Sequence, residues 1–208
     1  YQNGKPEYIS EKLYEKSRLI DLNSAAVSDP QGNLLFYTDG YNVWNKNNNE
    51  IIDFDKEKTI NRFALNTIIV PHRAKENIYY VFTSNCESYL RYYTIDMNKN
   101  DGMGAVISTD TLKPLESDHV ISTIETAHHA NDRDCWLVAV VDKKAPDREF
   151  YMYSWLIDID GIDKRPVITT HKIDKEIDNI FIDFSLVYDR DAGYVNGEYL
   201  LGWSKRGK

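Results

Sequence analysis

A unit made of a short apolar stretch, a polar turn and a longer apolar run occurs about four times in this chain of 208 residues. The clearest copy reads AAVSDPQGNLLFYTDG, from Ala25 to Gly40, and the units begin near residues 25, 68, 126 and 185. Equivalent points, separated by 43, 57 and 60 residues, are Val27, Val70, Ala127 and Val187. A repeat of this size built from short strands predicts an all-β chain folded as a β-propeller, in which each blade is one four-stranded sheet.

The long runs of the unit are apolar or aromatic at nearly every position. They are LLFYT (34–38), IYYVFT (78–83), CWLVAVV (135–141) and YLLGW (199–203). Strands of this kind need cover on both faces, which the packing of one blade against the next provides. An ordinary β-sandwich is the alternative, but its turns would recur about every 8 to 12 residues without a longer period.

The centres of these runs are the predicted core of the molecule. Because they have no solvent side, we expect the following residues to be buried between or within blades: Leu35, Phe36, Tyr80, Val81, Leu137, Val138, Leu200 and Leu201.

Turn residues divide each unit into three or four strands. The DPQGN segment at 29–33 should join two antiparallel strands, since proline presets φ and glycine permits positive φ. Further strands are expected at 41–45, at 90–97 as the outer strand of the second unit, and at 149–159 as the outer strand of the third. Residues 103–124 are interpreted as the last strand of one blade and a long crossing to the next.

The sequence divides into a lead-in segment, residues 1–22, and a propeller domain, residues 23–208. Blades of about 40 to 50 residues allow four to five in this length. The last unit stops before an outer strand can form. Either the lead-in segment completes the last blade, which gives a closed ring, or the chain is an excerpt of a larger ring of about seven blades.

Four segments in order resemble a known family. They are NLLFYTDGYNVWNKN (33–47), IIVPHRAKENIYYVFT (68–83), LRYYTIDMNKNDGMGAVIS (90–108) and the His129-Ala130-Asn131 triplet before CWLVAVV. Together they are similar to the amino-terminal, tryptophan-aspartate-like propeller region of Bacteroidetes exported surface proteins, which carry type IX secretion sorting or gliding-motility-associated domains. The resemblance, over about residues 23–203, implies a propeller fold and a secreted or cell-surface location, and it supplies no catalytic residues.

Composition excludes several functional classes. The formal net charge is −8 and there is no segregated basic patch, which argues against nucleic acid as a partner. No stretch approaches about 18 consecutive apolar residues, so we expect no membrane insertion. Solubility is the simplest explanation of the negative charge.

Candidate metal ligands are few. His128 and His129 are adjacent on a strand and point to opposite faces, so one of them is expected to bond loop backbone instead. Neither His72, His119 nor His171 has ligands at a recognised spacing. The acidic segment at 158–163 fails the calcium-loop spacing and is interpreted as a turn that ends a strand. We therefore predict no metal and no cofactor.

The two cysteines lie in different predicted blades, Cys86 in a polar turn and Cys135 at the start of an apolar run. This separation argues against a structural disulfide, and Cys135 is interpreted as a small core residue. Two cysteines do not decide the redox compartment.

For an enzyme, the sequence offers no G-x-S-x-G nucleophile motif. The predicted function is a non-enzymatic binding or scaffold module that recognises protein or glycan at the bacterial surface. The 15 Tyr and 4 Trp contain candidates for an aromatic platform. A carbohydrate-active propeller hydrolase is the alternative, with two of the 33 Asp and Glu paired in the central channel, and a structural spacer is a third class. No catalytic residue is assigned, and the ligand-binding residues remain open.

Overall fold

The computed structural model describes residues 24–38, 42–53, 66–84, 88–113, 119–143, 149–172, 181–184 and 201–204. The described residues form strands and turns, with one short 3-10 helix and no α-helix. All strand pairs are antiparallel. The prediction of an all-β chain is therefore confirmed.

The first sheet is a four-stranded meander in the order β1-β2-β3-β4. Its strands are β1 (Ala25–Ser28), β2 (Leu34–Thr38), β3 (Asn42–Asn45) and β4 (Glu50–Asp53). The predicted 29–33 segment joins β1 to β2. Gly32 has a φ of 85° there, so this turn needs the freedom of a glycine.

The second sheet repeats the same meander in the order β5-β6-β7-β8. Its strands are β5 (Asn66–Pro71), β6 (Ile78–Ser84), β7 (Leu90–Asp96) and β8 (Ala105–Leu112). The 3-10 helix η1 (Asn100–Gly102) lies between β7 and β8.

The third sheet follows the same path, β9-β10-β11, and then has a divided outer strand. Its strands are β9 (His119–His128), β10 (Cys135–Lys143), β11 (Glu149–Asp158), β12 (Gly161–Ile162) and β13 (Val167–Lys172). Both β12 and β13 pair with β11. Strand β12 pairs with residues 157–158 at the end of β11, and β13 pairs with residues 149–154. A two-stranded sheet, β14 (Phe181–Phe184) with β15 (Leu201–Ser204), follows.

Two expectations about strand order were wrong. The strands expected at 90–97 and 149–159 are third strands, β7 and β11, and the outer strands are β8 and the β12 and β13 pair. The third sheet also begins earlier than expected. Its first strand, β9, starts at His119, inside the 103–124 segment that was expected to hold the last strand of one blade and a long crossing to the next. Polar residues on exposed outer strands, such as Ser108 and Thr109 of β8, hide these strands from a search for apolar runs.

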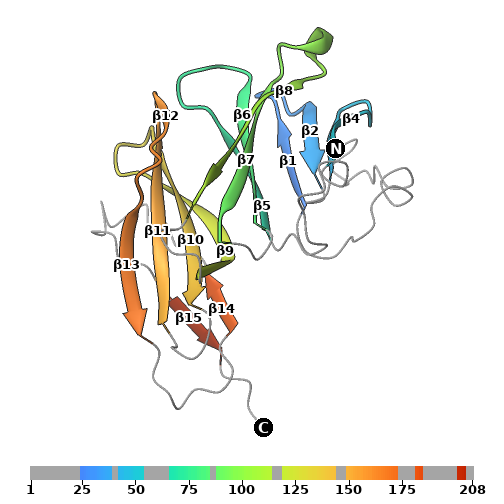
Figure 1. Ribbon diagram of the computed structural model, residues 1–208. Coiled ribbons are helices and arrows are strands. Elements are labelled where there is room, and N and C mark those ends of the chain that lie inside the picture. Colours follow the sequence, from blue (N-terminus) through green and yellow to red (C-terminus); the bar gives the residue numbers. More distant parts are fainter. Residues whose placement is uncertain are drawn as a thin grey trace.

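The three sheets stand side by side in chain order, and their first strands are neighbours, since β5 contacts both β1 and β9 (Figure 1). Sheets of the repeat thus face one another, as the runs that are apolar on both sides require. This arrangement is compatible with a β-propeller.

The second sheet is the middle layer of the core. Val81 packs in a cluster with Phe36 and Val43 of the first sheet, whereas its neighbour Phe82 packs with Leu137 of the third. Adjacent strand residues point to opposite faces, so one strand, β6, holds both interfaces.

Most of the predicted core is confirmed. Phe36, Tyr80, Val81, Leu137 and Val138 are at most 7% exposed. Leu35 is only partly buried, because the opposite side chain of β2, Phe36, takes the fully covered position. The side chains of Leu200 and Leu201 lie outside the described residues.

Candidate binding groove

In each of the three sheets, the residue directly after the first strand caps the following turn by accepting hydrogen bonds from backbone N–H groups. Asp29 Oδ1 accepts hydrogen bonds from the N–H groups of Gln31 (3.0 Å) and Asn33 (2.8 Å). His72 Nδ1 accepts from Ala74 N–H (3.1 Å), and His129 Nδ1 accepts from Asn131 N–H (3.2 Å). The three caps keep the spacing of Val27, Val70 and Ala127, so the repeat extends to single hydrogen bonds.

A second set of caps closes the turn after each third strand. Asn45 Oδ1 accepts from the N–H groups of Asn47 (3.0 Å) and Asn49 (3.1 Å). Asp96 and Asp158 accept in the same way from the N–H group two residues on, at 2.9 and 2.8 Å. These side-chain bonds to backbone are typical of Asx turns, and they fix the loops that carry the groove.

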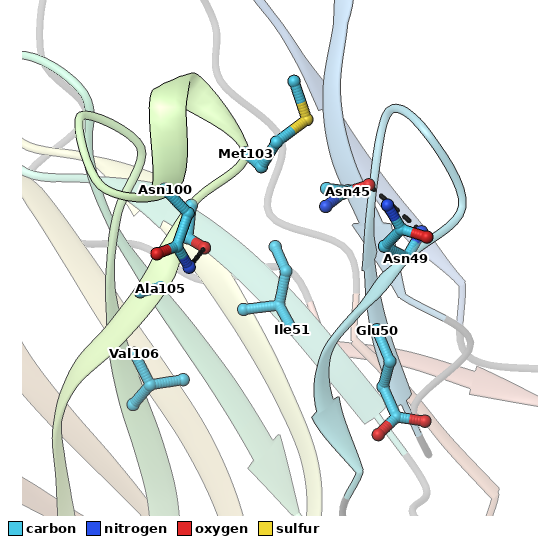
Figure 2. A pocket seen from close by; sticks show the side chains of 9 residues that line it. Asn45, Asn49, Glu50, Ile51, Asn100, Met103, Ala105 and Val106 are labelled. Carbon is cyan, nitrogen blue, oxygen red and sulfur yellow. Dashed lines mark hydrogen bonds between the residues drawn. The ribbon is translucent and has the colours of Figure 1, made fainter.

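A groove of about 460 Å³ opens between the turn that leads into β4 and the segment from η1 to β8 (Figure 2). Its size falls within the range of small-ligand sites. One wall comes from the first sheet and the other from the second. The lining residues are Asn45, Asn49, Glu50, Ile51, Asn100, Met103, Gly104, Ala105 and Val106.

Hydrogen bonds within the walls hold the groove's polar groups in place. Asn45 is 4% exposed, and its two bonds to backbone N–H groups fix the orientation of its amide. Across the groove, Asn100 Nδ2 donates to the Gly104 carbonyl at 3.0 Å. Asn47 Nδ2 donates to Met103 Sδ at 3.2 Å and so links the two sheets.

Gly104 allows the two walls to approach each other. Its φ is 84°, and a Cβ built there would lie 2.6 Å from Met97 Sδ and 3.3 Å from Ile51 Cδ1. The position thus requires glycine for its backbone conformation and for its packing.

In chemical terms the groove can bind but offers no reactive pair. Among the described residues that line it, Glu50 alone carries a charge, and none is a Ser, Cys, Lys or His. Carboxamides supply donors and acceptors, while Ile51, Met103 and Val106 supply apolar contact (Figure 2).

A charged cluster joins the second and third sheets. Lys164 Nζ donates to Asp110 Oδ2, and the Tyr92 hydroxyl also lies 3.5 Å from that oxygen. The bond from Lys164 lowers the pKa of Asp110. Burial, with a smaller contribution from the Asp110 charge, raises the pKa of Tyr92 to about 12.

One prediction about the histidines is confirmed. His129 bonds loop backbone, which confirms that interpretation for the 128–129 pair. His72 stacks on Tyr80, and burial, followed by the charge of Lys75, lowers its pKa. His119 is buried against Tyr151 with ring centroids 4.4 Å apart. The side chain of His171 lies outside the described residues.

Asp134 and Asp163, in two of the described turns, accept hydrogen bonds from neighbouring donors. Arg133 and Asn131 both donate to Asp134 and lower its pKa to about 2. Arg165 donates to Asp163 and lowers its pKa. Within the 158–163 segment, residues 159–160 form the turn that ends β11 and leads into β12, as predicted. No three His, Cys, Asp or Glu side chains of the described residues lie close enough together to hold a metal ion.

Cys135 is a free, buried thiol in the core between the second and third sheets. This confirms its interpretation as a small core residue, and burial raises the pKa of its thiol. Cys86 lies outside the described residues.

Of the Tyr and Trp side chains that the structure describes, the following are buried: Trp44, Tyr80, Tyr92, Tyr93, Tyr153 and Trp155. Trp44, Tyr93 and Trp155 are at most 2% exposed. Trp136 is partly buried and contacts His129, with ring centroids 5.7 Å apart. None of the aromatic side chains of the described residues lines the groove.

Comparison of the chain with protein-family models, with curated proteins and with solved structures finds no match. Of the described helices, none is long and apolar enough to cross a membrane.

The groove residues were not singled out from the sequence. The Asn-rich stretches at 46–49 and 98–100 both lie in turns. One sequence feature could have pointed to the groove: the two stretches follow the third strands of consecutive units. Turns at the same point of neighbouring repeats meet in space, and this places their amides on facing walls.

Proposed function

We propose that the chain is a β-propeller binding module of an exported bacterial surface protein, and that it recognises protein or glycan through its turn face. The turn face consists of the loops at 29–33, 46–49, 72–77, 97–104, 129–134 and 159–166. Export rests on the family resemblance of residues 23–203 described above.

The propeller is supported by the repeated meander. Three consecutive sheets have the same strand order, and their first strands β1, β5 and β9 follow one another in contact. In a propeller the first strand of each blade lies nearest the central axis, and neighbouring blades pack face to face. The clusters on both faces of β6 agree with this packing.

The groove is the single observation that carries the binding function. It is held open by capped turns of two sheets and lined by amides in place of paired carboxylates. A glycosidase needs one carboxyl whose pKa is raised so that it can act as an acid. Of the described residues that line the groove, Glu50 alone is a carboxylate, so they do not supply the pair of carboxyl groups that a glycosidase uses.

Titration of the purified chain against bacterial surface polysaccharide and against outer-membrane protein tests this function. The same samples are assayed for newly released reducing ends. We expect saturable binding without release. Release of reducing ends would instead support the hydrolase, and the absence of both would support a structural spacer.

A further inference from the structure

We propose that the groove between β4 and β8 is a site for an uncharged glycan, bound through its hydroxyl groups by Asn45 and Asn49. This inference rests on the proposed binding function and narrows its ligand to one class. The groove residues that carry the inference are Asn45, Asn49, Glu50, Ile51 and Met103.

The first step is the state of the Asn45 amide. Its oxygen is occupied by two backbone N–H groups, so the groups left to meet a ligand are the two N–H donors. Figure 2 shows the nitrogen on the side toward the groove. A buried amide that is already oriented loses little conformational entropy when it donates to a ligand.

The second step is the composition of the rim. Asn49 is exposed beside Asn45, and its carboxamide can donate and accept together. Neighbouring hydroxyl groups of a sugar also donate and accept together. An amide pair therefore matches a hydroxyl pair better than it matches a group that only accepts.

Charge selects among glycans. Of the described lining residues only Glu50 is charged, and it is acidic, in a chain whose formal net charge is −8. Phosphate, sulfate and uronate groups would meet a like charge and no cation among the described residues that line the groove. An uncharged glycan avoids this repulsion, and the C–H face of its ring can lie on Ile51 and Met103.

The test uses a panel of neutral and anionic oligosaccharides, followed by calorimetric titration of the best neutral binder into the full chain. Asn45→Asp keeps the oxygen that caps the turn and replaces the N–H donors by a second oxygen. Asn49→Ala removes an exposed amide and leaves the turn's backbone bonds intact. We expect each change to weaken binding about 3- to 10-fold, as the loss of one hydrogen bond implies.

Thr109→Ala is the control, because it removes an exposed polar side chain of β8 that lies outside both the groove and the turn face. Its affinity should equal that of the wild type. Melting temperatures identify any variant that fails to fold. If Asn45→Asp fails to fold, the affinity of Asn49→Ala alone tests the site. Neutral binding that both groove variants leave unchanged would overturn the glycan site.

Failure of the site and failure of the function give different results. Binding only to anionic glycans or to protein would overturn the neutral glycan site and leave the binding module standing. Absence of binding to every oligosaccharide, surface polysaccharide and outer-membrane protein tested would overturn both.

Discussion

At the residue scale, equivalent positions of the repeat keep the same hydrogen-bonding role although the amino acid differs. Asp29, His72 and His129 differ in chemistry, yet each supplies one unprotonated acceptor to the backbone of the turn after the first strand. A carboxylate and a neutral imidazole are interchangeable in this role. A comparison of residue identities alone therefore misses an equivalence that the hydrogen bonds reveal.

His72 gives a pH prediction with a definite sign. Its pKa is lowered in the folded chain, so folding favours the neutral ring. The stability from this group is complete above the unfolded pKa of about 6.5 and is lost as the pH falls through the lower folded pKa. His72→Asn keeps an acceptor that does not titrate, and denaturant unfolding should show a smaller loss of stability between about pH 7.5 and 5. An equal loss in both proteins would refute the role of His72.

Asp134 gives a second pH prediction in a lower range. Its folded pKa is about 2 because Arg133 and Asn131 donate to the ionised form. Its contribution is present above an unfolded pKa of about 4 and disappears as the pH falls through the folded value. Asp134→Asn should therefore lower the melting temperature near about pH 7 and have little effect near about pH 2. If the melting temperature of Asp134→Asn stays below that of the wild type near about pH 2, the variant has lost packing instead of a charge interaction.

At the element scale, the sequence was most informative where strands are buried. The apolar runs predicted β2, β6 and β10, and the DPQGN segment predicted the turn between β1 and β2. Outer strands were harder to predict, because their polar positions face water and resemble loops. The groove was unpredictable for a related reason, since its two walls are about 50 residues apart and meet only through the packing of sheets.

Gly104 tests how closely the groove walls are packed. Gly104→Ala combines an unfavourable positive φ with contacts to Met97 and Ile51 that are too short. Gly102→Ala is the control, because its φ is also positive, at 80°, and nothing lies within 4 Å of a Cβ there. The control should cost about 1 kcal/mol for backbone strain, and Gly104→Ala should cost about 1 to 3 kcal/mol more for overpacking. Equal costs in chemical denaturation would show that Met97 moves aside freely.

At the scale of the whole molecule, the second sheet couples the other two. Tyr80 and Phe82 of β6 belong to the core shared with the third sheet, and Val81 between them belongs to the core shared with the first. Loss of order in this sheet would expose both cores at once. We therefore expect the three sheets to unfold as one cooperative unit.

Phe82→Ala tests this coupling. Phe82 is fully buried, and its truncation should cost about 3 to 5 kcal/mol. If the sheets unfold together, amide hydrogen exchange should accelerate in β2 as well as in β10, although Phe82 packs only toward the third sheet. Ile107→Ala is the control, because this β8 side chain is 51% exposed and should leave exchange in both strands unchanged. Accelerated exchange confined to the second and third sheets would mean that the first sheet is stable without them, and the repeat would then be a row of separable units.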